Sequence, residues 1–223
     1  MKYLSIDIET TGLNPETCDI LQFAAVLDDT SNPKPIEDLP RFEAIFIQES
    51  YKGDPFALSM HSEIFKKIAI ARKKNLEYCP DNNIHFMTID HLPIALYLFL
   101  FKNYCSFLKN RGEEEITVLY INIAGKNVSS FDIPFLNAKI KDWKGLRFLN
   151  RSIDPAILYF DLENDVSLPD MKTCMQRAGI DGEVAHTAME DALVVVKLLR
   201  NKFFKEGNDV LRKKEQKKKD NRS

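Results

Sequence analysis

The sequence has few cysteines and no long hydrophobic run, and these shortages exclude several classes of protein. Its four cysteines are too far apart in the chain for a C-x-x-C pair, so we expect free thiols in a reducing compartment rather than disulfides or a zinc site. The longest apolar run, 92–101, is too short to span a bilayer and contains Pro93. The first residues read directly as a strand, without the pattern of a signal peptide. We therefore expect a cytoplasmic protein with no membrane partner.

The chain also lacks an overall positive charge and a glycine-rich phosphate-binding loop. The missing loop counts against a nucleotide phosphotransferase. The formal net charge is −2, but residues 211–223 carry seven Lys or Arg against two acids, which leaves the rest near −7. A net negative charge outside the tail does not exclude binding of nucleic acid. Carboxylates that bind metal ions make the formal net charge more negative, and the bound ions restore positive charge locally.

The hydrophobic content of 44% is enough for a substantial core. We expect one domain over residues 1–210, with an irregular insertion at 73–91 and a basic, disordered tail at 211–223. Three successive strands at the start predict an antiparallel meander, and the helices and strands that follow predict an α/β fold with a mixed sheet covered on both faces. The expected strands are 3–10, 20–27, 41–48, 116–123 and 148–153. The expected helices are 55–71, 92–110, 130–140, 168–178 and 187–205.

The first strand carries two acids on one face. Leu4, Ile6 and Ile8 alternate with Ser5, Asp7 and Glu9, and a Thr-Thr-Gly turn follows. Two carboxylates side by side repel each other, and a strand end with two acids beside a glycine turn favours a cation site. A solvent-facing edge strand is the alternative.

Two later segments repeat this theme. Asp132 follows the apolar strand 116–123 at the start of a helix, where the helix dipole favours an anion. His186 and Asp191 flank another helix start, because Thr187 and Glu190 match a capping box. With His186 before the helix and Asp191 in its first turn, both can approach one site. Each pattern taken singly also fits a structural role, such as a helix cap or a surface histidine.

Together these acids stand at ends of strands and starts of helices, and such places converge in open α/β sheets. Hard oxygen ligands select Mg²⁺ or Mn²⁺. Two such ions about 4 Å apart can clamp the attacking and leaving oxygens of a phosphoryl transfer. A neutral histidine nearby can accept the proton of the attacking water.

The ordered set of motifs resembles the DEDDh, or DnaQ-like, 3′→5′ exonucleases, which include polymerase proofreading domains, oligoribonuclease-like enzymes and RNase T. The first motif is the run from Asp7 to Leu13, and the second is Asn127 with Phe131-Asp132. The third is His186 with Asp191, at the H-x4-D spacing of the histidine subclass. The resemblance runs from about residue 3 to residue 200. It implies a ribonuclease H-like fold, with a mixed five-stranded sheet flanked by helices.

The resemblance also implies roles for the motif residues and two divalent ions, Mg²⁺ or Mn²⁺, as cofactors. Asp7, Glu9 and Asp191 would hold the first ion, and Asp7 with help from Asp132 would hold the second. His186 would be the general base. The residues that would hold the 3′ end of the substrate are Thr10, Thr11, Gly12, Leu13, His61, Asn127 and Phe131. Lys126 departs from the family pattern, since many members carry histidine there.

The resemblance implies removal of nucleoside 5′-monophosphates from 3′ ends of nucleic acid, with single-stranded DNA or frayed ends favoured. The motifs do not distinguish sugars, so an RNA-trimming or oligoribonuclease-like enzyme stays open. So does an idle domain that binds nucleic acid, a polymerase or another replication or repair protein, although binding alone does not require clustered acids.

Overall fold

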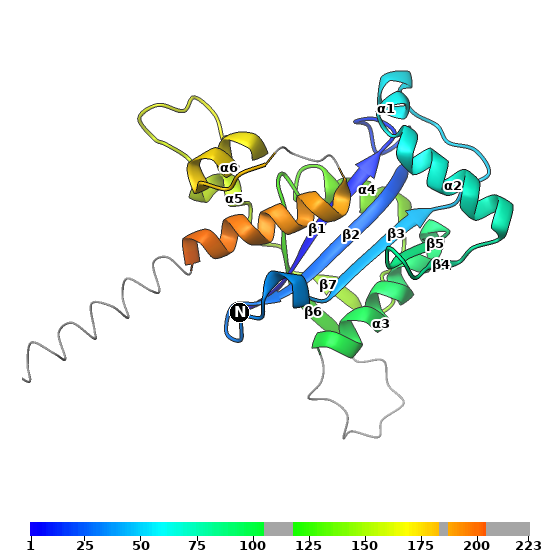
Figure 1. Ribbon diagram of the computed structural model, residues 1–223, viewed down its shortest axis with the longest axis horizontal. Helices are drawn as coiled ribbons and strands as arrows, with labels where there is room; N and C mark the ends of the chain where they lie inside the picture. Colours follow the sequence, from blue (N-terminus) through cyan, green and yellow to red (C-terminus); the bar gives the residue numbers. More distant parts are fainter. Residues whose placement is uncertain (105–117, 183–186, 204–223) are drawn as a thin grey trace, which may run out of the picture.

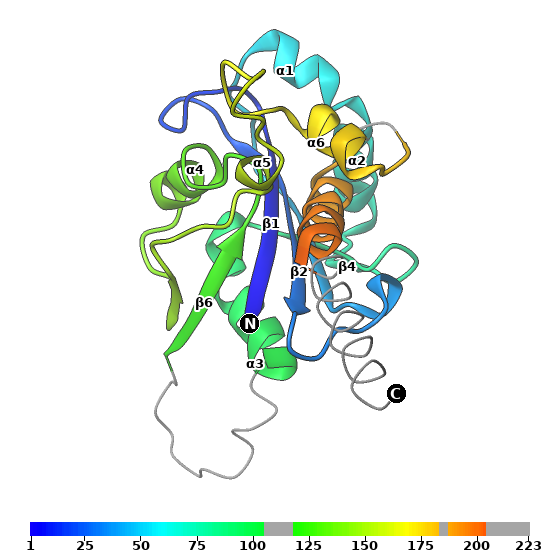
Figure 2. The same ribbon diagram turned by 90° about the vertical axis from the view of Figure 1, so that its left-hand side faces the viewer.

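The structure is a computed structural model that describes residues 1–104, 118–182 and 187–203. In this part of the chain, a seven-stranded mixed sheet in the order β4-β5-β3-β2-β1-β6-β7 is flanked by helices on both faces (Figures 1 and 2). The strands are β1 Lys2–Thr10, β2 Ile20–Asp29, β3 Arg41–Phe46, β4 Tyr78–Cys79, β5 Ile84–Met87, β6 Leu119–Ala124 and β7 Leu146–Phe148. The helices are α1 Pro55–Met60, α2 Ser62–Lys74, α3 Leu92–Tyr104, α4 Asp132–Lys139, α5 Pro155–Leu158, α6 Met171–Ala178, the 3-10 turns η1 Ile36–Asp38 and η2 Ile89–His91, and a helix over 188–203.

The predicted meander is confirmed, because β1 pairs antiparallel with β2, and β2 pairs antiparallel with β3. β6 then joins the other edge of β1 in parallel, and β7 joins β6 in parallel. This arrangement places β1 in the interior of the sheet, between an antiparallel and a parallel neighbour. The register shifts between Glu9 and Thr10, so the strand becomes irregular just after its two acids.

The alternation of β1 separates its side chains onto two faces, as predicted. Leu4, Ile6 and Ile8 belong to a buried cluster that includes residues of α3 and α4. The opposite face packs under the helix 188–203, where Tyr3 shares a buried cluster with Val195 and other apolar side chains of that helix. Figure 1 shows the last helix lying across β1 and β2. Asp7 and Glu9 lie on this same face, because their carboxylates are grouped with that of Asp191 from the last helix.

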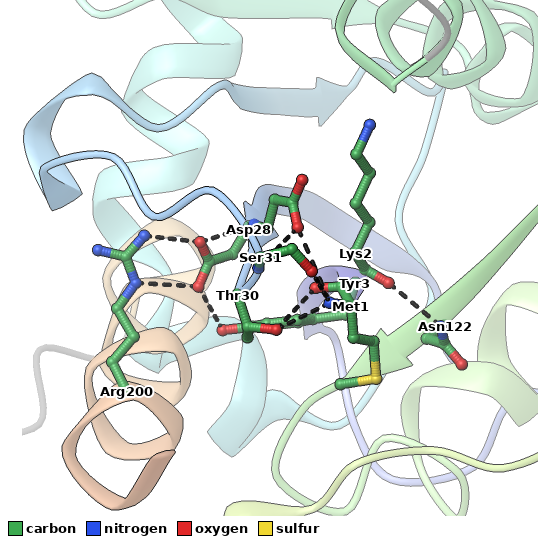
Figure 3. Close-up of polar contacts among 9 residues, drawn as sticks. Met1, Lys2, Tyr3, Asp28, Thr30, Ser31, Asn122 and Arg200 are labelled. Atoms are coloured by element: carbon green, nitrogen blue, oxygen red, sulfur yellow. Dashed lines mark hydrogen bonds and ion pairs between the residues drawn. The ribbon is translucent and has the colours of Figure 1, made fainter. Parts of the chain in front are cut away.

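A buried polar network holds the helix 188–203 against β1 and β2 (Figure 3). The Arg200 guanidinium donates to both carboxylate oxygens of Asp28, at 2.6 and 2.9 Å. The Tyr3 hydroxyl donates to the same carboxylate at 2.7 Å. Burial would raise the pKa of Asp28, but the hydrogen bonds from Arg200 and Tyr3 hold that pKa below its ordinary value. Near the other end of the helix, the Ser5 hydroxyl donates to the Ala192 carbonyl at 2.8 Å, so contacts to the sheet fix both ends.

The structure differs from the sequence prediction in the segment 73–91. We expected an irregular insertion, but it contains β4 and β5, and β5 pairs in parallel with β3. Ile84 and Phe86 are buried in the cluster that includes α2. Strands of two and four residues are too short to give a clear period in the sequence. The strand expected over 148–153 was also placed too late in the sequence, because β7 ends at Phe148 and only an isolated bridge follows at Ile153.

The helix expected over 55–71 is two helices, because α1 ends and α2 begins at His61. His61 has φ −96° and ψ 29°, outside the helical region, so the chain changes direction there. The final part of the helix expected over 92–110 and the basic tail 211–223 lie outside the described residues. Of the described cysteines, Cys18, Cys79 and Cys174 are free thiols, as expected. Among the helices within the described ranges, none is long and apolar enough to cross a membrane.

Candidate metal centre and adjoining pocket

Three acids from the two ends of the chain meet on one face of the sheet. Asp7 and Glu9 lie two residues apart on β1, and Asp191 lies in the first turn of the helix 188–203. One carboxylate oxygen from each of the three lies within 4.8 Å of the others. The convergence predicted from the sequence is therefore present for these three acids.

Asp132 completes the acidic surface of the same cavity. It is the first residue of α4 and is 3% exposed. Together with Asp7, Glu9 and Asp191 it lines a cavity of about 360 Å³. Its place at the helix start agrees with the prediction, and its carboxylate also accepts hydrogen bonds from the backbone of Asp132 itself and of Ile8.

Burial and mutual repulsion disfavour the charged forms of these carboxylates. Burial, and then the charges of Asp132, Glu9 and Asp191, raise the pKa of Asp7 well above its ordinary value. Burial followed by repulsion from Asp191 and Asp132 raises the pKa of Glu9 to about 8. Burial raises the pKa of Asp132 to about 7, although backbone hydrogen bonds oppose the shift. A cation among these oxygens would relieve the repulsion, so the site suits a metal.

The last helix begins where the capping pattern predicted. Residue 188 is the first helical residue, and Thr187 accepts a long hydrogen bond of 3.4 Å from the Glu190 amide. The Thr187 hydroxyl also donates to the Glu190 carboxylate at 2.9 Å. This cap places Asp191 in the first helical turn. His186, the predicted general base, lies outside the described residues.

A second cavity of about 880 Å³ adjoins the acidic one, and the two share Ile8, Glu9 and Phe131 as lining residues. Of the residues predicted to hold a substrate end, those lining this pocket are Thr10, Gly12, Leu13, His61 and Phe131. The Leu13 side chain is 85% exposed. The His61 imidazole Nε2 lies 3.7 Å from a Glu9 carboxylate oxygen, so this histidine stands at the boundary between the pocket and the acids.

The other two predicted substrate residues lie elsewhere. Asn127 lines the acidic cavity instead. Thr11 is fully buried and lines neither of these cavities. Both of its backbone polar groups form hydrogen bonds with other parts of the chain. Its amide donates to the Asp19 carbonyl at 2.9 Å, and its carbonyl accepts from the Asp54 amide at 2.7 Å. Thr11 therefore ties the end of β1 to Asp54, the residue that caps α1 and lines the pocket.

The pocket residues that sequence reasoning did not identify include two large apolar side chains of α1. Phe56 and Met60 of α1 line the cavity while remaining 73% and 55% exposed. Their spacing of four residues fits the inner face of an amphipathic helix equally well, so the sequence pattern indicated core packing. Gly12 lines the same pocket, and the turn after β1 requires glycine there because its φ is 157° and a Cβ would lie 2.6 Å from the Cys18 Sγ.

The comparisons with known proteins support the fold. No family model matches the sequence, and no curated protein matches it. Similar solved structures include E. coli exonuclease I in complex with a dA16 oligonucleotide, with 15% identity and a TM-score of 0.53 over 89% of this chain and 40% of that chain. Another exonuclease I structure has 16% identity and a TM-score of 0.55 over 89% and 40%. An exonuclease I complex with SSB-Ct has 15% identity and a TM-score of 0.53 over 92% and 42%.

The chain thus spans about two fifths of the length of these structures. At this level of identity the likeness concerns the fold. The protein has an α/β, ribonuclease H-like fold, a mixed sheet flanked by helices similar to the matched part of exonuclease I.

Proposed function

We propose that the protein is a metal-dependent 3′→5′ exonuclease that hydrolyses the terminal phosphodiester bond of nucleic acid, with single-stranded DNA as the favoured substrate. The observation that carries the proposal is the meeting of Asp7, Glu9 and Asp191 within 4.8 Å, beside a pocket with room for a nucleoside. The fold shared with exonuclease I, whose structures include oligonucleotide complexes, is consistent with it.

The donor set fits a hard divalent ion. Oxygens at about 2.1 Å from a Mg²⁺ ion lie roughly 3–4 Å from one another, and the three carboxylate oxygens are already grouped at a similar spacing. Asp7, Glu9 and Asp191 would hold one Mg²⁺ or Mn²⁺, while Asp7 and Asp132 would hold a second. Ions bound there would supply positive charge for the phosphate oxygens and the leaving group.

The protein's own side chains provide positioning and proton transfer. Leu13, Phe56 and Met60 offer apolar surface for the terminal nucleoside, and this pocket leads directly to the carboxylates through Glu9 and Phe131. Burial at the acidic cavity restricts water around the reacting phosphate. His186 would accept the proton of the attacking water, as its place before Thr187 and the family resemblance suggest.

A digestion series tests the proposal. Single-stranded DNA and RNA labelled at the 3′ or the 5′ end are incubated with the protein in EDTA, Mg²⁺ or Mn²⁺. We expect early release of 3′-labelled mononucleotide and stepwise shortening of the 5′-labelled strand, both abolished by EDTA. Asp7→Asn and Asp191→Asn should be inactive yet folded by circular dichroism, whereas Glu63→Gln, on the exposed surface of α2, should retain full activity.

Three outcomes would contradict the proposal. These are full activity without a divalent ion, early release of the 5′ label, and unchanged activity in both carboxylate variants. Comparing DNA with RNA substrates in the same series decides which sugar the pocket accepts.

A further inference from the structure

The cavity that holds the four acids also has one cationic lining residue. Lys126 follows β6 and lines the cavity with Asp7, Asp132 and Asp191. Among the described residues that line the acidic cavity or the adjoining pocket, no other lysine or arginine is found. In the proposed function the carboxylates bind metal ions. The positive charge of Lys126 would then be available to bind an anionic ligand.

The backbone that carries Lys126 is held rigidly against β1. A Cβ on the preceding Gly125 would lie 2.8 Å from the Ile6 carbonyl oxygen, so only glycine permits this approach. The next residue, Asn127, has a left-handed φ of 56°, and its amide donates to the Asp154 carboxylate at 2.9 Å. Asp154 also caps α5 by accepting from the Ala156 amide. The turn is therefore pre-organised.

The Lys126 ammonium is oriented by its neighbour and retains capacity for a ligand. Its Nζ donates to the Asn127 side-chain oxygen at 3.1 Å. An ammonium has three N–H donors, so this hydrogen bond leaves others for phosphate oxygens. The pKa of Asp170 is lowered mainly by hydrogen bonds from Thr173 and, to a smaller extent, by the charges of Lys172 and Lys126. Lys126 therefore lies close enough to Asp170, the N-cap residue of α6, for their charges to interact.

The lining of the two cavities indicates the ligand. In the proposed function the large pocket takes the terminal nucleoside, and the carboxylates take the phosphodiester bond to be broken. Lys126 lines the acidic cavity but not the large pocket, so a strand that continues from the nucleoside past the carboxylates would meet it. We propose that Lys126 binds the next phosphate upstream of the scissile one. It would hold the incoming strand without taking part in the bond cleavage. This inference rests on the proposed function.

Two substrates separate an upstream contact from a role in chemistry. The first is a dT12 strand with a phosphorothioate at its 3′-terminal linkage to slow cleavage, whose binding is measured by fluorescence anisotropy in Mn²⁺ at several salt concentrations. The second is the p-nitrophenyl ester of thymidine 5′-monophosphate, which contains the scissile bond and no upstream phosphate. The variants are Lys126→Met, Lys126→Arg and the control Lys172→Met, which removes a charge near the same Asp170 but outside both cavities.

We expect Lys126→Met to weaken binding of dT12 roughly tenfold and to make the slope of log K against log salt shallower by about 0.7, the value for one phosphate contact on a single strand. Its kcat/KM on the nitrophenyl ester should stay within about twofold of the wild-type value. Lys126→Arg should keep both properties, and Lys172→Met should keep the affinity and slope for dT12.

Equal losses on dT12 and on the nitrophenyl ester would overturn the inference, since Lys126 would then act at the scissile phosphate or on the structure of the site. Unchanged dT12 binding, or an equal loss in Lys172→Met, would overturn it as well. A wild-type protein that hydrolyses neither the ester nor any oligonucleotide would refute the proposed function itself. Hydrolysis without the Lys126 effect would refute only this inference.

Discussion

The raised pKa of Glu9 makes a specific prediction about stability in the absence of metal. Glu9→Gln keeps the size of the side chain and removes its charge. The pKa of Glu9 rises from an ordinary 4.5 to about 8 in the folded protein, so the folded state holds this proton more tightly than the unfolded chain does. The ionised form therefore destabilises the metal-free fold, and the penalty is absent below pH 4.5 and complete above pH 8.

The size of the penalty follows from the same shift. At pH 7 the unfolded chain has lost this proton while the folded protein mostly retains it, which corresponds to a free-energy cost of about 3 kcal/mol. Glu9→Gln should recover an amount of that order, or roughly 6–12 °C in Tm for a chain of this length. Asp132, with a pKa of about 7, should add to the wild-type pH dependence in the same direction.

Urea unfolding followed by circular dichroism at pH 5, 6, 7 and 8 measures this effect. In EDTA, the free energy of unfolding of the wild-type protein should fall as the pH rises, and Glu9→Gln should show a smaller fall. Saturating Mg²⁺ should restore wild-type stability at pH 8, with less effect on the variant, which lacks one ligand. Glu63→Gln is the matched control, since the Glu63 side chain is 75% exposed and should change stability by less than about 0.5 kcal/mol.

A wild-type stability that is constant or rises between pH 5 and pH 8 in EDTA would refute the reasoning. So would a Glu9→Gln variant that is less stable than the wild type at pH 8 without metal. Either result would mean that Glu9 is held by compensating contacts as a structural residue.

Three further predictions concern the last helix and the regions around it. Arg200→Met should destabilise the protein by about 3–5 kcal/mol in urea unfolding, because it leaves the buried Asp28 carboxylate unpaired. Adding Asp28→Asn should recover part of the loss. Equal stability of the single and double variants would contradict this prediction. His186→Ala should lower kcat by about 10²–10⁴-fold with little change in substrate affinity. The pH–rate profile of this variant should lack the fall at low pH that imidazole protonation causes. An unchanged rate would remove His186 from the mechanism. Truncation at residue 211 should weaken binding of long strands and flatten its salt dependence, while turnover at saturating substrate stays near the full-length value; identical salt slopes would make the tail irrelevant to binding.

The sequence by itself determined those features that arise from local periodicity and capping. The period of two in β1 assigns Leu4, Ile6 and Ile8 to one face and the acids to the other, because a strand alternates whatever surrounds it. The Thr187 and Glu190 pattern located the helix start, and with it the place of Asp191 in the first turn. Meander topology followed from three successive strands with no helix expected between them.

Only the tertiary structure decided which distant groups meet and which apolar residues remain outside the core. Ser5 and Ala192 are 187 residues apart, and Asp28 and Arg200 are 172 apart, yet these contacts hold the helix that brings Asp191 to Asp7 and Glu9. No local pattern encodes such pairings, because a buried polar group finds its partner only when the chain is folded. The same limit applies to Phe56 and Met60, whose helical spacing fits a core face, whereas packing leaves them exposed beside the site. Exposure depends on what the rest of the chain covers, so it is a property of the assembled fold.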